Sequence, residues 1–227
     1  MKISVIIPTR NEEINIALAI HYLRTTSDRN TTEIIVVDGQ SSDRTIDIAQ
    51  GLADKVIRAV CLGRAAQMHE GALSANGDLL LFLHADTQLP ANWQERLNEV
   101  WAPDNKTIAT AFRLGFDSER PFFRFLASVA NWRTSWTCVP HGDQSISIQK
   151  DIYFRVGGFP PVPIMEEYFL FKKLRRLGCV RLLPEAIKTS VRRYEQNGRV
   201  FNGLRNVLII ALFYLGVPPR HLARMYW

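Results

Sequence analysis

The sequence lacks several features that would assign it to a class at once. Its 227 residues contain three cysteines, Cys61, Cys138 and Cys179, and no Cys-x-x-Cys pair. Neither a disulfide framework nor a structural zinc site is therefore expected, and we predict small buried thiols in a reducing compartment. No apolar run reaches the ~20 residues of a transmembrane helix. The apolar start of the chain meets Pro8 and Arg10 too early for a signal peptide.

Composition and charge exclude further classes. Hydrophobic residues make up 47% of the chain and charged residues 22%, which excludes a mainly disordered, collagen-like or coiled-coil protein. The net charge is +6, from 28 Lys and Arg against 22 Asp and Glu. Residues 1–167 contain 16 basic and 20 acidic side chains, whereas residues 168–227 contain 12 and 2. No nucleic-acid-binding motif accompanies this basic part. We expect no nucleic-acid partner, and a cytoplasmic protein whose basic, apolar C-terminus contacts the inner face of a membrane peripherally.

The first 90 residues alternate short apolar runs with helical patterns. We expect strands at 2–8, 33–38, 55–60 and 78–86, separated by helices at 14–23, at 41–52 with Ser42 as N-cap, and at 63–77, closed by Gly77. Strands that alternate with helices predict βαβ units and a mostly parallel α/β sheet.

The rest of the chain is less regular. Strands are predicted at 107–116 and 143–149, and helices at 121–132, at 166–178, closed by Gly178, and at 199–216. The uncharged stretch 206–219 favours a buried helix, with a membrane-surface helix as the alternative. Repeats, low-complexity tracts and linkers are absent from the sequence, which predicts a single domain.

Polar residues follow three of the predicted strands, at the edge where open α/β sheets bind ligands. These segments are PTRNE at 8–12, DGQSSD at 38–43 and HADT at 84–87. The chain contains no GxGxxG after the first strand, no GxxxxGK[ST] and no GxSxG. These absences weigh against a dinucleotide fold, a P-loop and a serine hydrolase.

Five segments in sequence order resemble a family 2 glycosyltransferase with the GT-A fold. They are SVIIPTRNEE, EIIVVDGQSSDRT, GDLLLFLHADTQLP, GGFP and MEEYFLFKKLRRLG, which together reach about Leu177. The His-Ala-Asp and Gly-Asp-Gln segments resemble a small subgroup, some of which is linked to arsenosugar biosynthesis, one option for the acceptor. The resemblance implies a Rossmann-like mixed sheet flanked by helices. It divides the single domain into a nucleotide-sugar half (1–90), an acceptor half (91–190) and a C-terminal helical extension (191–227) with an apolar helix.

The resemblance implies transfer of a sugar, with inversion, from a nucleotide-diphosphate donor such as a UDP-sugar to an acceptor hydroxyl. Asp38 would accept a hydrogen bond from the base, and Arg64 would neutralise a phosphate or be a solvated helix-start residue. The implied donor-binding residues are Pro8, Thr9, Asn11, Glu12, Asp38, Gly39, Ser41, Ser42, Arg64, His84 and Asp86.

Asp86 matches the last carboxylate of the family's Asp-x-Asp metal motif. It would hold Mn²⁺ or Mg²⁺, cations that prefer oxygen ligands and bridge the donor phosphates. His84 replaces the first Asp of that motif. It is expected to contact the nucleotide, to orient Asp86, to ligate the metal, or to be a structural histidine.

An inverting transfer needs a base for the acceptor hydroxyl, and the family places it in a Glu-Asp pair at a helix start. Here the pair is Glu166-Glu167, in which Glu167 matches the base and Glu166 would contact the acceptor. Because Glu is longer than Asp by one methylene, Glu166 remains the alternative base. Phe169 stands where the family often has a further acid.

The acceptor is expected to contact His141, Asp143 and Gln144, a segment that is as readily a plain turn. Trp132 and Trp136 are expected in the core, or else in an acceptor wall. Two other functions stay open. A nucleotidyltransferase of similar topology would show a Gly-rich basic loop after the first strand, which this chain lacks. A catalytically decayed nucleotide-sugar-binding protein would account for His84, Glu167 and Phe169.

Overall fold

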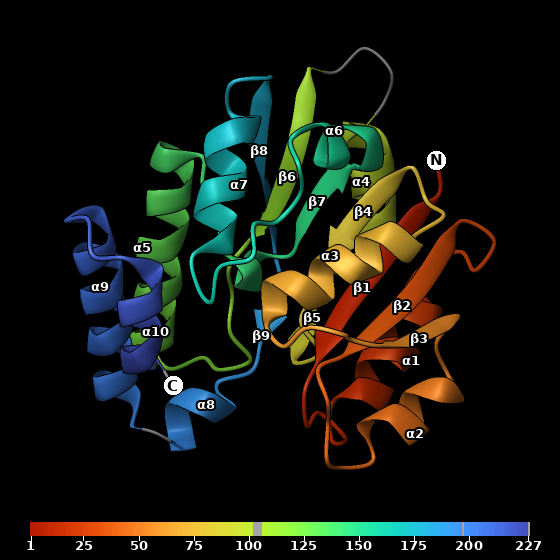
Figure 1. The fold of residues 1–227 in the computed structure, drawn as a ribbon, viewed down its shortest axis with the longest axis horizontal. Coiled ribbons are helices and arrows are strands. Elements are labelled where there is room, and N and C mark those ends of the chain that lie inside the picture. The colour runs from red at the N-terminus through yellow and green to blue at the C-terminus, as the bar shows by residue number, and fades with distance from the viewer. Residues whose placement is uncertain (102–105, 197, 227) are drawn as a thin grey trace.

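A seven-stranded sheet forms the centre of the protein (Figure 1). The computed structural model describes residues 1–101, 106–196 and 198–226. The strand order is β3-β2-β1-β4-β7-β6-β8; β7 is antiparallel to both its neighbours, and the other pairs are parallel. The strands are β1 (Ile3–Thr9), β2 (Thr32–Asp38), β3 (Lys55–Arg58), β4 (Leu79–Phe82), β6 (Thr107–Arg113), β7 (Ile146–Gln149) and β8 (Cys179–Ala186). The predicted mixed, mostly parallel α/β sheet is confirmed, and β8 is an edge strand that the sequence did not indicate.

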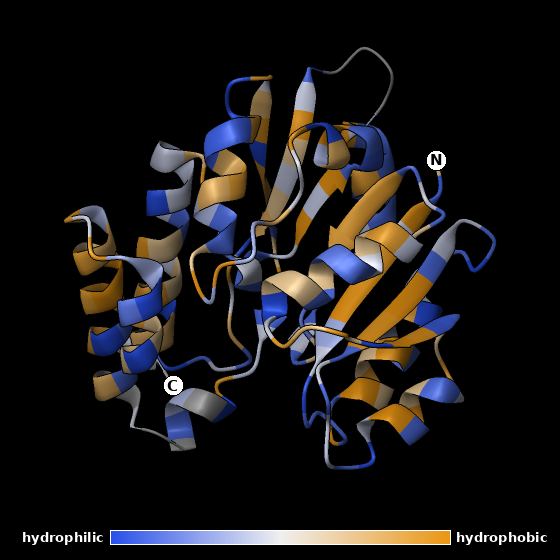
Figure 2. Ribbon diagram, in the orientation of Figure 1, coloured by the Kyte–Doolittle hydropathy of each residue, from blue (hydrophilic) through white to orange (hydrophobic). Residues whose placement is uncertain are grey.

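Helices cover both faces of the sheet because successive strand side chains point to opposite faces. Ile3, Val5 and Ile7 of β1 pack on one face, under α1 (Ile16–Thr26), α2 (Thr45–Gln50) and α4 (Trp93–Val100). Ile6 and Phe82 pack on the other, under α3 (Arg64–Ser74), α6 (Lys150–Arg155) and α7 (Glu166–Leu174). Figure 2 shows the strands as predominantly hydrophobic, as expected for a sheet buried on both faces.

The C-terminal elements gather beside edge strand β8 (Figure 1). They are α8 (Arg192–Gln196), α9 (Arg199–Tyr214) and α10 (Pro219–Tyr226), next to α5 (Pro121–Thr137). Buried Ile164, Ile209 and Leu222 form a small apolar cluster of their own there. A two-stranded sheet of β5 (Thr87–Gln88) and β9 (Lys188–Thr189) joins this part of the chain to the loop after β4.

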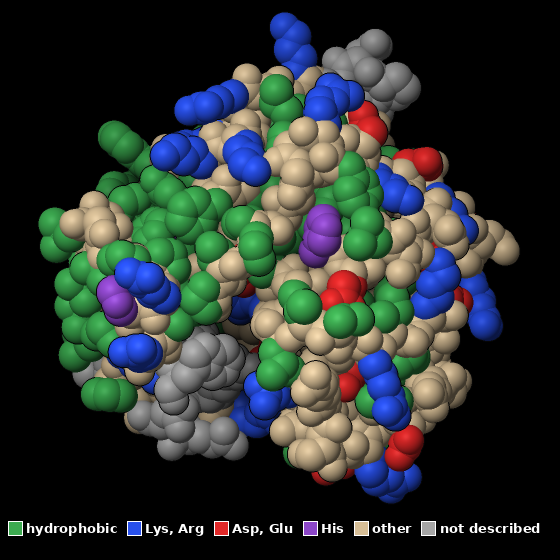
Figure 3. All heavy atoms as spheres, viewed as in Figure 1, with side chains coloured by type: hydrophobic (Ala, Val, Ile, Leu, Met, Phe, Trp, Pro, Cys, Tyr) green, Lys and Arg blue, Asp and Glu red, His purple; other side chains and the backbone are tan. Residues whose placement is uncertain are grey.

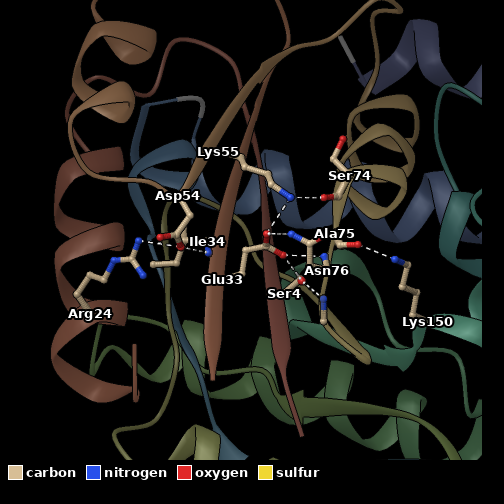
Figure 4. A network of polar contacts seen from close by, with 11 residues as sticks. Ser4, Arg24, Glu33, Ile34, Asp54, Lys55, Ser74, Ala75, Asn76 and Lys150 are labelled. Atoms are coloured by element: carbon tan, nitrogen blue, oxygen red, sulfur yellow. Dashed lines mark hydrogen bonds and ion pairs between the residues drawn. The ribbon is translucent and has the colours of Figure 1, made fainter. Parts of the chain in front are cut away.

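Buried Glu33 connects several elements at the end of the sheet where the parallel strands begin (Figure 4). Its carboxylate accepts hydrogen bonds from Ser4 Oγ at 2.7 Å and from Asn76 N at 2.8 Å, and pairs with Lys55 Nζ at 2.9 Å. Burial raises the pKa of Glu33, but the hydrogen bonds from Asn76, Lys55 and Ser4 outweigh it and bring the pKa to about 2. The network ties β1, β2, β3 and the turn after α3 together.

Several local expectations are corrected. Cys61 and Cys179 are exposed and Cys138 is partly buried, because Cys61 lies in the loop after β3 and Cys179 begins the edge strand. Helix α2 begins at Thr45 rather than near Ser42. Helices α3 and α7 end at Ser74 and Leu174, before Gly77 and Gly178. A Cβ at Gly77 would lie 2.7 Å from Ser4 N, so that glycine allows a close backbone approach instead.

Candidate active site

The first group of predicted site residues meets where β1 and β2 end. Thr9 and Asp38 are register partners, and both are buried. Ser41 donates two hydrogen bonds to the Asp38 carboxylate, one from its hydroxyl and one from its backbone N at 2.9 Å. Asn11 N donates in turn to Ser41 Oγ at 2.8 Å. The two loops therefore form one unit, in which Ser41 covers the carboxylate that was predicted to recognise the base.

The same two loops each contain one residue in an unusual backbone conformation. Asn11 and Gln40 adopt positive φ values of 55° and 63°, a region that non-glycine residues rarely occupy. Asn11 stabilises it through its side chain, because Asn11 Oδ1 accepts a hydrogen bond from Ser42 N at 2.9 Å. Pro8 is partly buried and Gly39 buried, while Asn11 and Ser42 are exposed. Exposed polar groups on a braced loop are suited to contact a ligand.

Gln67 of α3 connects the C-terminal ends of β1 and β2, and the sequence analysis did not identify it. Its Nε2 donates to Thr9 O and to Val37 O, both at 2.8 Å. A Cβ at Gly39 would lie 2.9 Å from the same nitrogen, so the glycine makes room for the clamp. A single glutamine within an amphipathic helix carries no motif, so no signal in the sequence marked it.

Glu12 connects the first loop to the C-terminal part of the chain. Its Oε2 accepts a hydrogen bond from Asn15 Nδ2 at 2.6 Å and pairs with Arg192 Nη2 of α8 at 3.2 Å. Ser190 N, just before α8, donates to Asp86 O at 3.0 Å. Arg192 thus pairs with one predicted donor residue, Glu12, although 180 residues separate the two, and Ser190 contacts another, Asp86. This distance along the chain hid it from sequence reasoning.

The second group lies at the start of α7. Arg64, the first residue of α3, pairs through Nε with Glu166 Oε1 at 2.7 Å, and its Nη2 lies 3.8 Å from Glu167 Oε1. Glu166 and Glu167 are 1% and 5% exposed. Arg64 is therefore engaged by carboxylates, with Glu166 as its nearer partner.

Gly142 brings His84 and Glu167 together. A Cβ at Gly142 would lie 2.5 Å from Glu167 Oε1 and 3.1 Å from His84 Nε2. The missing side chain lets both groups approach the short 3₁₀ turn of Gly142–Gln144. In Figure 3 this face of the molecule is hollowed between α10 and the N-terminal end of α3.

Glu167 has the electrostatics of a base. Burial and then the charge of Glu166 raise the pKa of Glu167 to about 7, against the opposing effect of Arg64. A carboxylate with a pKa near neutrality accepts protons far better than an ordinary one. The two adjacent acids therefore differ: Glu166 is held by a cation, and Glu167 is poised to change its protonation.

The three residues predicted to contact the acceptor, His141, Asp143 and Gln144, lie in or beside the 3₁₀ turn. Burial, followed by the charges of Arg133 and Arg64, lowers the pKa of His141 to about 3, so its ring is neutral. Burial raises the pKa of Asp143. Gln144 is fully buried, and its Oε1 accepts hydrogen bonds from Thr134 Oγ1 at 2.7 Å and His141 N at 3.1 Å. Gln144 supports the turn from the buried side, and its contact with an acceptor remains a prediction.

Asp86 offers one carboxylate at the end of β4. It is partly buried, and its Oδ1 accepts a long hydrogen bond from Thr87 Oγ1 at 3.4 Å. Among the residues that the structure describes, no three His, Cys, Asp or Glu side chains gather to hold a metal. A single carboxylate fits a Mg²⁺- or Mn²⁺-type cation that takes most of its ligands from bound phosphates and water.

Two tryptophans expected in the core lie at the surface. Trp132 and Trp136 of α5 are 65% and 78% exposed. They border an open groove between α5 and β8, together with Arg113 and Pro184. The core prediction fails because α5 packs on the protein through Phe123 and Thr134, on its other side.

The chain matches known proteins over most of its length. Residues 4–162 match the family described as Glycosyl transferase family 2. An uncharacterized glycosyltransferase of Rickettsia typhi is 34% identical over 113 residues, which are 50% of this chain and 37% of that protein. The matches span 37% to 39% of the first curated relatives' own length.

Solved structures share the fold. A mannosyltransferase of Pyrobaculum calidifontis in complex with GDP-Man and Mn²⁺ gives a TM-score of 0.69 at 21% identity, over 99% of this chain and 68% of that one. Glucosyl-3-phosphoglycerate synthase of Mycobacterium tuberculosis, in complex with Mn²⁺, uridine diphosphate and glucosyl-3-phosphoglycerate, gives 0.67 at 19% identity, over 96% and 81%. The GT-A fold expected from the sequence is therefore confirmed.

Proposed function

The chain belongs to glycosyl transferase family 2, and from that membership we propose that it transfers a sugar from a nucleotide-diphosphate sugar to an acceptor hydroxyl, inverting the anomeric carbon. The observation that carries the proposal is the buried pair Glu166–Glu167 beside Arg64, in which the pKa of Glu167 is raised to about 7. An inverting displacement needs one such base on the side from which the hydroxyl attacks.

Glu167 is the proposed base. As the acceptor oxygen bonds to the anomeric carbon, Glu167 takes the hydroxyl proton, and the bond to the donor diphosphate breaks. Glu166 pairs with Arg64 at 2.7 Å, and its charge helps to keep the pKa of Glu167 high. His84 lies by the same turn as Glu167 and is proposed to position it, while His141 and Asp143 face the acceptor.

The donor is proposed to lie along the ends of β1, β2 and β4. The loops that contain Asn11 and Ser41 would hold the nucleoside. Asp38 would accept a hydrogen bond from an N–H of the nucleobase once the Ser41 side chain no longer hydrogen-bonds to it. Arg64 and Arg192 supply positive charge for the diphosphate. The structural neighbours hold GDP-Man or UDP with Mn²⁺, and we propose a donor of this chemical class here.

Asp86 is the residue proposed to hold the divalent cation, Mn²⁺ or Mg²⁺. When bound, such a cation neutralises the negative charge that develops on the departing diphosphate. The neighbours' Mn²⁺ supports this role, as does the partly accessible position of Asp86 in the loop after β4. We further propose that the protein works in the cytoplasm at the inner face of a membrane.

Thermal shift with UDP- and GDP-sugars, with and without Mn²⁺, tests the proposal. We expect one nucleotide class to raise the melting temperature, and Mn²⁺ to increase that shift. Asp86→Ala should abolish the Mn²⁺-dependent part and leave the melting temperature of the free protein within a few degrees. Failure of every nucleotide to stabilise the protein would contradict the enzyme proposal. Binding without donor turnover would indicate a decayed site, and conversion of donor and pyrophosphate into a nucleoside triphosphate would indicate a nucleotidyltransferase.

A further inference from the structure

Helix α9 is apolar on its outward side as well as on the side that packs on the protein. Asn202 (4% exposed) and Ile209 (3% exposed) are buried, and Phe213 packs beside Ile209, whereas other large apolar side chains of α9 and its C-cap Leu215 face solvent. A surface helix of a globular protein normally carries its apolar stripe only on the side that faces the core. The exposed side chains are Phe201 (66%), Leu204 (66%), Val207 (57%), Leu208 (49%), Tyr214 (56%) and Leu215 (80%). We call this set the outer face of α9.

The orientation of α9 is fixed by specific packing. A Cβ at Gly203 would lie 3.4 Å from Phe122 Cζ, so α9 approaches α5 closely at that residue. Phe213 packs edge-on against Tyr168 of α7 with ring centroids 4.7 Å apart. Ile209 is buried in the C-terminal apolar cluster with Leu222. Rotating the helix to bury its outer face would break these contacts, so the exposure is a property of the fold.

The outer face forms one continuous line. Positions 201, 204, 208, 211 and 215 are spaced alternately by three and four residues and are all exposed, which places them on one side of a helix. The helix has 16 residues, about 24 Å at 1.5 Å per residue. No helix among the residues that the structure describes is long and apolar enough to cross a membrane. The outer face is thus shaped to lie along a surface.

Basic side chains surround this apolar line. Residues 168–227 contain 12 basic and 2 acidic side chains. Both acids are already paired, Glu185 with Arg96 at 2.6 Å and Glu195 with Arg120 at 3.0 Å. Arg220 and Arg224 of α10 are exposed, as are the basic residues at the end of α7. Figure 3 shows Lys and Arg bordering an apolar area over α7, α9 and α10.

We propose that the outer face of α9 docks on an anionic lipid bilayer, with its apolar side chains at the level of the headgroups and the surrounding cations on acidic lipids. Apolar burial and attraction to anionic lipid add in this arrangement. A second copy of the chain is a poorer occupant, because it would bring two strongly basic surfaces together. The inference rests on surface chemistry and does not depend on the proposed sugar transfer.

Co-sedimentation with vesicles tests the docking face. The protein should bind vesicles that contain phosphatidylglycerol, bind pure phosphatidylcholine vesicles much more weakly, and lose affinity as salt is raised. The double substitution Leu204→Gln with Leu208→Gln should lower the affinity about tenfold or more. Ile14 and Leu18, 69% and 70% exposed and also four residues apart, provide the matched control: Ile14→Gln with Leu18→Gln should bind as the unaltered protein does.

Three outcomes would overturn the proposal. They are no binding to anionic vesicles, equal binding by the Leu204/Leu208 variant, and a dimer in light scattering that this variant dissociates. The last would make the outer face an interface between copies of the chain. Circular dichroism and donor-induced thermal shift serve as folding controls. A loss of vesicle binding with the donor shift retained supports docking by itself, and a missing donor shift bears on the sugar-transfer proposal instead.

Discussion

At the scale of single residues, two neighbouring glutamates take on different roles through their surroundings. Glu166 is 2.7 Å from Arg64 Nε, whereas Glu167 Oε1 is 3.8 Å from the guanidinium and lies against the Gly142 turn. Burial, followed by the charge of Glu166, raises the pKa of Glu167, and the Arg64 guanidinium opposes that rise. The two adjacent carboxylates therefore differ in their distance from one cation, and Glu166 is its nearer partner.

Replacing each acid in turn tests this division. Glu167→Gln should lower kcat by about 10²- to 10⁴-fold, because the amide cannot accept the proton. Since the pKa of Glu167 is about 7, activity of the unaltered enzyme should rise with pH through neutrality, as the carboxylate forms. Glu166→Gln should keep more activity and shift that rise to lower pH, because a negative charge beside Glu167 is removed. Steady-state kinetics of the two variants from pH 5.5 to 9 measure kcat and its pH dependence. A larger loss of kcat in Glu166→Gln than in Glu167→Gln would make Glu166 the base.

The substitution Glu167→Gln should also stabilise the folded protein at alkaline pH. A carboxyl whose pKa is raised by folding favours the folded state while protonated, and that contribution is lost as pH rises through about 7. At pH 8.5 the Glu167→Gln variant should therefore have a higher melting temperature than the unaltered protein. Its free energy of unfolding should be larger by about 1–3 kcal/mol. Near pH 4.5 the two melting temperatures should converge. Calorimetry at both pH values gives the comparison, and a lower stability of the variant at pH 8.5 would contradict the assigned burial.

At the scale of elements, the two edges of the sheet are held by different means. At the edge where the strands begin, Glu33 joins β1, β3 and the turn after α3 through charge-assisted bonds. At the site edge, the uncharged Gln67 clamps Thr9 O and Val37 O. Because Gln67 is neutral, it adds no charge to the end of the sheet near Asp86, Arg64 and Arg192.

Glu33→Ala should destabilise the protein by about 3 kcal/mol, because it leaves Lys55 and the Asn76 amide without their carboxylate. The pKa of Glu33 falls from its ordinary 4.5 to about 2 on folding. Its contribution is therefore complete above pH 4.5 and is lost as pH falls toward 2. Urea unfolding at pH 7 and pH 3 measures the difference. Glu119→Ala, at an exposed position, should change stability by less than about 0.5 kcal/mol; equal effects of the two variants would refute the network's role.

At the scale of the whole molecule, the C-terminal part of the chain contacts the loops that follow β1 and β4. Arg192 reaches Glu12, Ser190 N donates to Asp86 O, and β9 pairs with β5 just after Asp86. The division into a donor half at 1–90 and an acceptor half at 91–190 remains a prediction. The continuous sheet does intermix the two stretches, since β7 pairs with β4.

Arg192→Ala should raise the KM for the donor about tenfold and leave kcat nearly unchanged, because it removes a cation from the diphosphate side and the contact with Glu12. Arg29→Ala provides the control, since Arg29 is exposed in the turn before β2, at the opposite edge of the sheet. Initial-rate kinetics over donor concentration separate KM from kcat. An unchanged KM in Arg192→Ala would remove Arg192 from the donor site.

The sequence by itself determined the alternation of strands and helices along the first half, the family, and the polar segments that follow the strands. These depend on local periodicity and on motifs of contiguous residues such as HAD and MEE, which need no knowledge of distant contacts. It did not indicate β8, because Pro184 interrupts its pattern and proline is tolerated in a sheet mainly at edge strands, nor the exposure of Trp132 and Trp136.

Only the tertiary structure decided which charges meet. The pairs Arg64–Glu166 and Glu12–Arg192 span 102 and 180 residues, and the buried hydrogen bonds of Gln144 to Thr134 and His141 became visible only in the structure. The outward turn of α9 likewise depends on the packing of Gly203 against Phe122. Motif and periodicity are local in the chain, whereas burial and ion pairing are set by the packing of distant segments. This packing raises the pKa of Glu167 and leaves the outer face of α9 exposed.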